Sequence, residues 1–273
     1  MTVDSETADA DWSARVRHAE PVMGTVVSFD VPARARADGS LEAAVSWLHW
    51  VDRVFSPYRA DSDVTLLADG AVTVDGCVPE LAEVIDACAF VAELSGGYFT
   101  DTPSGRFDPT GYVKGWAVER AAAVLSAAGS VSHLVNGGGD VQCAGGRLVP
   151  AAGPGGQPQT VAWRVGIADP FRPGQLALVV NAADCGVATS GTAERGPHIV
   201  NPRAGRPAAG LASLTVTGPS LALADAFATA AFAMGPGLAR DWTEALDGYH
   251  AYAITDTGET WQTSGFAARV TAG

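Results

Sequence analysis

The spacing of apolar and polar residues predicts two amphipathic helices in the N-terminal part of the chain. In residues 41–55, and again from Pro79 to Leu94, apolar side chains recur every three or four positions, which places them on one face of a helix. Pro79 suits the first turn of a helix, and Gly96 and Gly97 end the second one.

The remaining segments mix further helices with short strands. Runs rich in β-branched residues predict strands, and long alanine-rich runs predict helices. The predicted strands are 22–30, 132–136, 161–168, 176–182, 185–189 and 211–217, and the further predicted helices are 113–128, 219–234 and 236–246. Glycine and proline predict a loop at 98–112 and an exposed hairpin or loop at 144–158. They also predict a C-terminal hairpin that turns at Asp256-Thr257-Gly258. Because strands and helices do not alternate regularly, we predict an α+β fold.

The domain organisation follows from the same pattern. Residues 1–20 are polar and acidic, and we expect a poorly ordered N-terminal leader there. Residues 21–273 contain no linker long enough to require a boundary, so they are predicted to form a single domain.

Composition excludes several classes of function. Thirty acidic residues against seventeen lysines and arginines give a net charge of −13. No cluster of basic residues is visible, so nucleic acid is not an expected partner. The chain shows no apolar run of membrane-spanning length and no secretory signal, so we expect a cytoplasmic protein without a membrane anchor. The four cysteines are widely separated, which favours reduced thiols over a zinc or redox site.

A candidate metal site lies in the late segment ALADAFATAAFAMG. Asp225 and Thr229 are four positions apart and would share one face of a helix. A carboxylate and a hydroxyl that converge suit Mg²⁺, which prefers oxygen ligands. The alternative is that both residues lie near a helix N-terminus, where they cap the helix or are exposed to solvent. The apolar surroundings favour the metal site, because a buried aspartate needs a partner.

A candidate phosphate site lies in FDPTGYVKGWAVERAA, residues 107–122. Lys114 stands between Gly111 and Gly115 where a loop enters a helix, and helix amides with a lysine suit a pyrophosphate. Neither a Walker loop nor a Rossmann fingerprint fits this spacing, and an ordinary loop with a surface lysine is the alternative. The glycine run of VNGGGDV, residues 135–141, permits close backbone approach to a ligand or forms a tight turn.

Two further residues have both functional and structural interpretations. His198, in SGTAERGPHIVNPRAGRP, could shuttle a proton or hold a phosphate or flavin edge, or it could be structural. Tyr58, in FSPYRADSDV, could stack on an aromatic ring or belong to an ordinary loop after a helix.

The order of the motifs is more specific than any one of them. The chain runs through MGT, FSPYRADSDV, SGGYF, DPTGYVKGWAVERAA, VNGGGD, SG…HIVNPRAG and TVTGPSLALADAFATAAFAMG. From about residue 21 to residue 262 this series resembles the ApbE family of FAD:protein FMN transferases. The resemblance implies an α+β fold with FAD in a cleft. It also implies Mg²⁺-dependent transfer of FMN from FAD to a Ser or Thr hydroxyl of an acceptor flavoprotein, with release of AMP.

The resemblance also implies roles for individual residues. The metal ligands would be the carbonyl of Gly111 and the side chains of Asp225 and Thr229. His198 and Asp225 are the candidates for a base that helps to deprotonate the acceptor hydroxyl. The implied FAD contacts are Met23, Tyr58, Tyr98, Phe99, Asp108, Lys114, His198 and Ile199.

The chain departs from the family pattern at three points. Thr100 stands where an aspartate is usual, and Gly111 stands where alanine is usual, which a carbonyl ligand tolerates. The stretch between SGGYF and the KG motif is shorter than usual, which predicts fewer adenine contacts. Two alternatives stay open, namely a metal-dependent FAD pyrophosphatase that forms FMN and AMP, and a non-catalytic FAD-binding protein.

Overall fold

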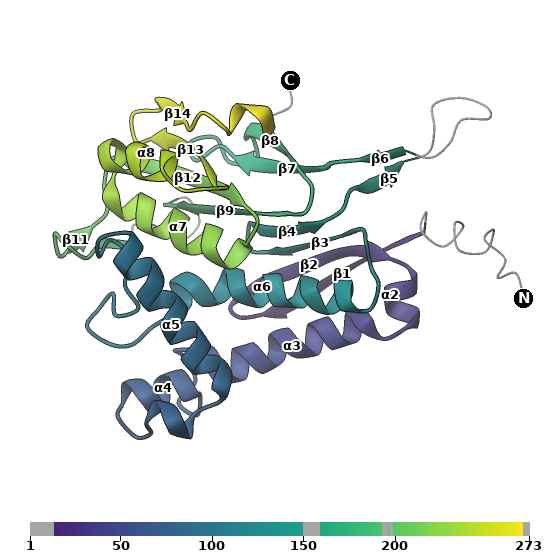
Figure 1. Cartoon of the computed structure of the whole chain (residues 1–273), viewed down its shortest axis with the longest axis horizontal. Helices are drawn as coiled ribbons and strands as arrows, with labels where there is room; N and C mark the ends of the chain where they lie inside the picture. The colour runs from purple at the N-terminus through teal and green to yellow at the C-terminus, as the bar shows by residue number, and fades with distance from the viewer. Residues whose placement is uncertain (1–13, 150–158, 193–195, 197–198, 270–273) are drawn as a thin grey trace, which may run out of the picture.

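The computed structural model describes residues 14–149, 159–192, 196 and 199–269 (Figure 1). The strands are β1 (Arg15–Val22), β2 (Thr25–Pro32), β3 (His133–Gly137), β4 (Asp140–Ala144), β5 (Arg147–Val149), β6 (Gln159–Val161), β7 (Trp163–Ala168), β8 (Leu176–Ala182), β9 (Cys185–Gly191), β10 (Val200–Asn201), β11 (Arg206–Pro207), β12 (Leu211–Gly218), β13 (His250–Thr255) and β14 (Thr260–Gln262). The helices are α2 (Arg34–Ala37), α3 (Ser40–Phe55), α4 (Asp63–Ala68), α5 (Pro79–Leu94), α6 (Thr110–Ala127), α7 (Leu221–Met234) and α8 (Pro236–Glu244), with 3₁₀ turns η1 (Val74–Gly76) and η2 (Ala267–Arg269).

An antiparallel sheet of eight strands forms the centre of the described residues, in the order β1-β2-β3-β4-β9-β12-β13-β14. Helices α3, α6 and α7 pack on one face of this sheet (Figure 1). The hairpin β7–β8 packs on the opposite face, over β4 and β9. Helices and sheet are therefore combined without parallel βαβ units, which confirms the predicted α+β fold.

The central strands are buried on both faces, because the helices cover one face of the sheet and the β7–β8 hairpin covers the other. In β9, Val187 packs toward the β7–β8 hairpin, while Ala188 packs toward the helices, as the two-residue period of a strand requires. Every residue of β12 is buried. Helix α7, composed mainly of alanine, is buried on nearly all sides, so its single carboxylate, Asp225, lies within the protein.

The helices predicted from periodicity are confirmed, and the start of α6 is corrected. The helix predicted at 113–128 begins at Thr110, so the predicted loop at 98–112 ends earlier. The amides of Tyr112 and Val113 both donate to the carbonyl of Pro109, and the Asp108 carboxylate accepts from the amide of Thr110. These bonds form a helical turn within the motif that the glycine and proline content had suggested was a loop.

The N-terminal prediction is wrong in two respects. The strand predicted at 22–30 is confirmed as β2 from Thr25 onward, but it begins too early, because Met23 and Gly24 have φ values of 55° and 69° and join β1 to β2 in a two-residue turn. Positive φ at both central residues is the mark of a type I′ hairpin turn. Part of the leader predicted at 1–20 is ordered, because β1 begins at Arg15 and pairs along its length with β2. Residues 1–13 lie outside the described part of the chain.

Two negative findings concern the membrane and the cysteines. Among the described residues, no helix is both long enough and apolar enough to cross a membrane. Each of the four cysteines lies in this part of the chain and is a free thiol, as predicted.

Candidate functional site

Three charged side chains meet where α6 lies against α7 and the strand β4. The Lys114 Nζ pairs with Asp140 Oδ2, and it lies 3.8 Å from Asp225 Oδ1. The side chains of Asp140 and Asp225 are 1% and 4% exposed. Carboxylates so deeply buried are costly unless they are paired. The lysine and nearby amides supply partners, since the amide of Thr189 donates to Asp140 Oδ1 at 3.0 Å.

The close approach of α6 and α7 depends on Gly115. A Cβ at this position would lie 2.7 Å from the Leu221 carbonyl oxygen and 2.8 Å from the Asp225 Cβ. The Gly115 amide donates to Asp225 Oδ2 at 2.9 Å. In a regular helix this amide bonds to the carbonyl four residues earlier, which is that of Gly111. Asp225 therefore competes with the Gly111 carbonyl for one donor.

Oxygen donors gather beside this contact. The hydroxyls of Ser190 and Thr229 lie 3.3 Å apart. A Cβ on Gly111 would lie 3.7 Å from the Thr229 Cγ2 and 3.2 Å from a ring carbon of Phe99. The structure thus brings the predicted ligands Gly111, Asp225 and Thr229 into one neighbourhood.

The donor set is suited to a hard cation with few protein ligands. Within the described residues, no group of three or more His, Cys, Asp or Glu side chains could hold a metal ion. The predicted set instead combines the Asp225 carboxylate with a hydroxyl and a carbonyl. Mg²⁺ usually takes one or two carboxylates and keeps several waters, so this sparse all-oxygen set is compatible with it.

Helix α6 also holds the first turn of α7. Glu119 Oε2 accepts hydrogen bonds from the Ser220 hydroxyl at 2.7 Å and from the Ala222 amide at 2.8 Å. Ser220 in turn accepts from the Leu223 amide at 3.3 Å. A carboxylate at a helix N-terminus satisfies its unpaired amides and is favoured by the helix dipole. The position of Asp225 is therefore fixed from α6 by both Gly115 and Glu119.

The anion-binding role expected for the start of α6 rests mainly on Lys114. The amides of Thr110, Tyr112 and Val113 are already bonded to Asp108 or Pro109. They are therefore not open to a phosphate in this conformation. The ammonium of Lys114, whose side chain is 26% exposed, is the part of the motif that a phosphate can reach.

Two glycine-containing turns lie side by side near this cluster. A Cβ on Gly138, in the β3–β4 turn, would lie 2.7 Å from the Thr25 hydroxyl of the β1–β2 turn. The Gly139 amide donates to the Asn136 side chain at 2.9 Å. The MGT and NGGGD motifs, distant in sequence, are thereby adjacent. Met23 is partly buried against the main core.

Other predicted FAD contacts lie at varied depths. Phe99 is buried and touches the Gly111 backbone region, whereas Tyr58 is 95% exposed after α3. The Arg203 guanidinium lies 5.5 Å from the centre of the Tyr98 ring, which links the SGGYF segment to the β10–β11 loop. Ile199 is partly buried against the main core.

His198, predicted both as a base and as a flavin contact, lies outside the described residues. Its roles stay predictions. The Asp108 carboxylate caps the start of α6 in this structure, and its contact with FAD also stays a prediction.

Sequence reasoning missed Asp140 and Glu119 as site residues. Asp140 directly follows the glycine run, and an acidic residue at that position was a usable signal. Glu119 lies one helical turn beyond Gly115 on α6, so the glycine that permits the helix contact also marked the face on which Glu119 lies.

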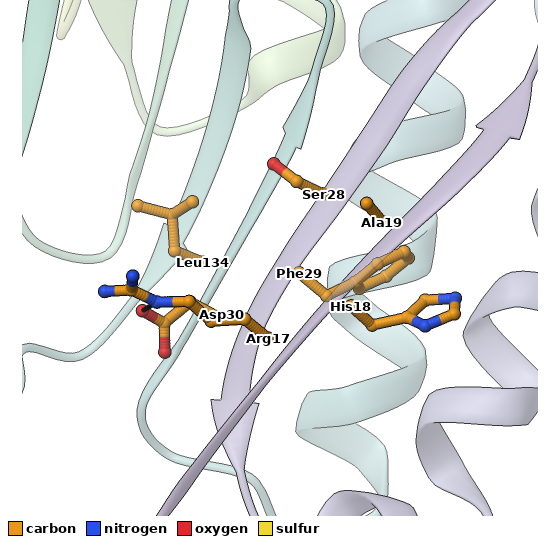
Figure 2. A pocket seen from close by; sticks show the side chains of 7 residues that line it. All are labelled: Arg17, His18, Ala19, Ser28, Phe29, Asp30 and Leu134. Carbon is orange, nitrogen blue, oxygen red and sulfur yellow. Dashed lines mark ion pairs between the residues drawn. The ribbon is translucent and has the colours of Figure 1, made fainter.

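Two surface cavities lie away from the cluster. One of about 280 Å³ is lined by residues of β1, β2 and β3, among them His18 and Phe29 (Figure 2). Another of about 310 Å³ lies beside α8 and β13, against Glu244 and His250. Neither is lined by Lys114 or by the aspartates that contact it. They do not extend the candidate site.

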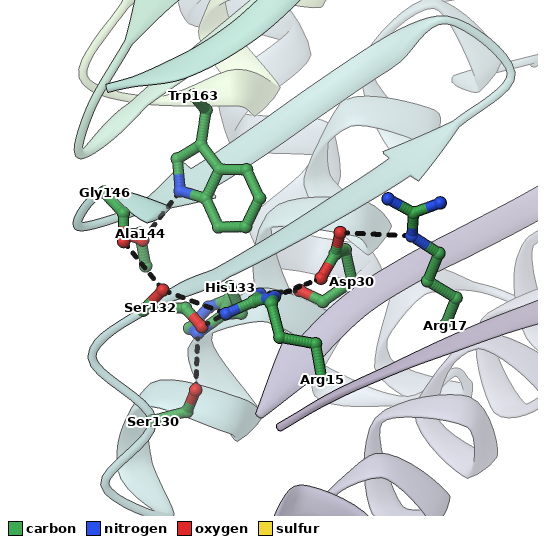
Figure 3. A network of polar contacts seen from close by, with 9 residues as sticks. All are labelled: Arg15, Arg17, Asp30, Ser130, Ser132, His133, Ala144, Gly146 and Trp163. Carbon is green, nitrogen blue, oxygen red and sulfur yellow. Dashed lines mark hydrogen bonds and ion pairs between the residues drawn. The ribbon is translucent and has the colours of Figure 1, made fainter. Parts of the chain in front are cut away.

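A polar network joins β1, β2 and the start of β3 and contains none of the three cluster residues (Figure 3). The Arg15 guanidinium donates to the Asp30 carbonyl at 2.8 Å and to the Ser132 hydroxyl at 3.2 Å. His133, fully buried, lies 3.1 Å from the Ser130 hydroxyl through Nδ1. Burial lowers the pKa of His133 to about 4, although a hydrogen bond with the Ala122 backbone opposes the shift. This histidine is therefore neutral near pH 7 and is a buried structural residue.

Together, the fold and the cluster define an α+β protein with a buried, oxygen-rich site suited to a hard cation and an anionic ligand. The model of the ApbE family matches residues 100–253. This match covers more than half of the chain, and the chain belongs to the ApbE family.

Curated relatives carry one activity in their names. The FAD:protein FMN transferase of Rhodobacter capsulatus is 31% identical over 253 residues, which cover 87% of this chain and 43% of that protein. The one from Treponema pallidum is 37% identical over 135 residues, which cover 45% of this chain and 36% of that protein. The chain thus spans less than half of the length of these relatives.

Solved structures show the same fold. The flavin transferase ApbE from Vibrio cholerae superposes with a TM-score of 0.79 at 20% identity, over 94% of this chain and 99% of that one. The ApbE protein from Thermotoga maritima gives a TM-score of 0.80 at 22% identity, over 94% and 100% of the two chains.

Proposed function

We propose that this chain transfers FMN from FAD to a Ser or Thr hydroxyl of an acceptor protein, with Mg²⁺, and releases AMP. The observation that carries the proposal is the buried meeting of Lys114, Asp140 and Asp225. It gives a member of the ApbE family both cationic and oxygen-donor groups for a metal-bound pyrophosphate. The curated relatives bear the name of this activity.

Gly111, through its carbonyl, and the side chains of Asp225 and Thr229 would hold the metal. Two buried carboxylates face the ammonium of Lys114 at this position. Buried carboxylate charge is unfavourable unless cationic groups or hydrogen bonds offset it, and a bound metal ion would contribute to that. When bound, Mg²⁺ supplies neutralisation of charge on the pyrophosphate.

The residues of the chain then act mainly by binding and orientation. Lys114 contacts a pyrophosphate oxygen and balances the charge of the leaving AMP. The acceptor hydroxyl oxygen bonds to the flavin-side phosphorus, the bond from that phosphorus to the bridging oxygen breaks, and the hydroxyl proton is released. The Asp225 carboxylate accepts a hydrogen bond from the Gly115 amide and faces Lys114. Both contacts favour its charged form, which suits a metal ligand better than a base. His198 is the remaining candidate for the base.

Some of the FAD contacts in this proposal lie beside the cluster. Phe99 and Lys114 lie nearest to the predicted ligands. Because the side chain of Tyr58 is almost wholly exposed, its ring is accessible for stacking on an aromatic ring of FAD. The MGT turn with Met23 stands beside the glycine turn that leads to Asp140.

The direct test is incubation with FAD and Mg²⁺, with and without an extract of the source cells as the supply of acceptor. AMP is measured by chromatography, and covalent flavin is detected by in-gel fluorescence after denaturation. AMP that appears only with the extract, together with a fluorescent band, supports transfer. AMP without acceptor indicates hydrolysis, and flavin binding without AMP indicates a binding protein. The Asp225→Asn variant is the control for contaminating activity.

A further inference from the structure

Cys143 and Cys185 lie directly opposite each other on neighbouring strands. In the antiparallel pairing of β4 with β9, the Cα atoms of these two residues are register partners (Figure 1). Both side chains are buried in the cluster beneath the β7–β8 hairpin, so both point to the same face of the sheet. Opposed residues of an antiparallel pair have Cα atoms about 4.5–5.5 Å apart, and a disulfide needs about 4.4–6.8 Å. The backbone therefore already meets the requirement of a cross-strand disulfide.

The register of the two strands is fixed on both sides of this cysteine pair. Toward one end, the Thr189 amide of β9 donates to Asp140 Oδ1 of β4 at 3.0 Å. Toward the other end, the Gly145 amide donates to Asp184 Oδ1 at 2.6 Å. A slip of one residue would turn one of the thiols to the opposite face of the sheet, and both bonds oppose such a slip. The two thiols therefore stay opposite each other, and no rearrangement of the sheet is needed to join them.

The two thiols have unequal surroundings. Burial raises the pKa of Cys143, and the neighbouring Cys185 and Asp184 add to this rise. Burial also raises the pKa of Cys185, but the Arg269 guanidinium and a backbone hydrogen bond with Ala183 oppose the rise. The thiolate is the nucleophile in thiol–disulfide exchange. Cys185 is therefore the thiol that is better prepared to react first.

We propose that Cys143 and Cys185 are a redox modification site, which closes to a cross-strand disulfide by exchange with a small-molecule disulfide such as oxidised glutathione. The Cys185 thiol loses its proton to solvent, and its thiolate attacks one sulfur of oxidised glutathione. One glutathione thiolate leaves and takes up a proton. The Cys143 thiol then loses its proton and attacks the Cys185 sulfur, so that the second glutathione thiolate leaves and is protonated. The two cysteines lose two electrons, and oxidised glutathione gains them as it becomes two thiols.

Both thiols lie under a cover that must open before exchange. Cys143 is 1% and Cys185 is 3% exposed, and Phe266, beside the turn η2, is fully buried in the same cluster. Exchange in the folded protein therefore proceeds through local opening and takes minutes to hours.

The bond would act on the strand pair beside the candidate site. Asp140 lies on β4 three residues before Cys143, so a link from β4 to β9 reinforces the pairing that holds Asp140 in place. The link also closes a loop that contains the β7–β8 hairpin, which restricts the unfolded chain and stabilises the folded one. The inference does not rest on the proposed flavin transfer.

The test incubates the folded full-length chain overnight with oxidised glutathione and, in parallel, with reduced glutathione. Remaining thiols are alkylated, and the protein is digested with trypsin, which places Cys143 in peptide 121–147 and Cys185 in peptide 165–195. We expect mass spectrometry to find these two peptides joined after oxidation and separate after reduction. The oxidised protein should melt about 5 °C or more above the reduced one.

Single variants test the order of attack, and each is checked for folding by circular dichroism. Neither Cys143→Ala nor Cys185→Ala can form the link, so neither should gain melting temperature with oxidised glutathione. The thiol that remains in Cys143→Ala should react with oxidised glutathione severalfold faster than the thiol that remains in Cys185→Ala, because it forms a thiolate more readily.

Three results would overturn the inference. One is a folded wild type in which peptides 121–147 and 165–195 stay separate, including the case in which oxidation is confined to peptide 60–106, which carries the other two cysteines. Another is a linked protein that melts no higher than the reduced one, since the bond would then strain the sheet. The third is faster reaction of Cys185→Ala than of Cys143→Ala, which would reverse the order of attack. The two wild-type measurements decide the matter even where a single variant does not fold.

Discussion

Replacement of Gly115 by alanine tests whether the α6–α7 contact sets the site. The added Cβ would meet the Leu221 carbonyl oxygen at 2.7 Å, the Asp225 Cβ at 2.8 Å and the Ala222 Cα at 3.2 Å. These are mainly backbone neighbours, so the helices must separate. Alanine gains up to about 1 kcal/mol of helix propensity, whereas overpacking costs about 1–3 kcal/mol. With two contacts under 3 Å, we expect a net loss of about 1–2 kcal/mol.

The assay is urea unfolding of the variant beside a matched control, Gly237→Ala. Gly237 lies in α8, and no neighbouring atom lies within 4 Å of the position that an added Cβ would take. Only the propensity gain applies there, up to about 1 kcal/mol. Because separation of the helices also displaces Asp225, Gly115→Ala should bind Mn²⁺, a spectroscopic stand-in for Mg²⁺, more weakly while Gly237→Ala should not. Wild-type stability together with wild-type Mn²⁺ affinity in Gly115→Ala would refute the reasoning.

Three further predictions concern the metal, the ligand and pH. Asp225→Ala should lower flavin transfer at least about a hundredfold, because one such electrostatic contact is worth several kcal/mol; near-normal turnover of the folded variant at low Mg²⁺ would contradict the ligand role. Calorimetry should show that FAD binds much more tightly than FMN in the presence of Mg²⁺, because only FAD carries a pyrophosphate, and EDTA should reduce this difference in affinity. Equal affinities for FAD and FMN that do not change with EDTA would exclude the pyrophosphate site. Burial lowers the pKa of His133 from 6.5 to about 4, so the unfolded chain takes up a proton at a higher pH than the folded protein does. The folded state therefore has its full stability above pH 6.5 and loses part of it as the pH falls toward 4. The loss amounts to about 3 kcal/mol. It should be visible as a steeper fall in the urea midpoint of the wild type than of His133→Gln, and parallel curves would rule it out.

Local patterns predicted most helices because the information lies within each segment. Ser40–Phe55 and Pro79–Leu94 have apolar residues at helical spacing and clear ends, and both helices form within a residue of the prediction. The same reasoning failed at Met23-Gly24, where a tight turn needs only two residues and leaves the surrounding β-branched run unbroken. It also placed the start of α6 too late, because the bonds of Asp108 and Pro109 that form the first turn are not visible in periodicity. The single domain over 21–273 stays a prediction.

The sequence by itself determined the kinds of groups available to the site and the elements that carry them. It placed Asp225 and Thr229 on one face of a helix, and Lys114 near the start of another. Only the tertiary structure decided that Asp140 pairs with Lys114 and that the Gly115 amide reaches Asp225, 110 positions away. The physical reason is that these contacts depend on which strands are neighbours and on how closely two helices cross. Neither property is encoded in the spacing of residues within one segment.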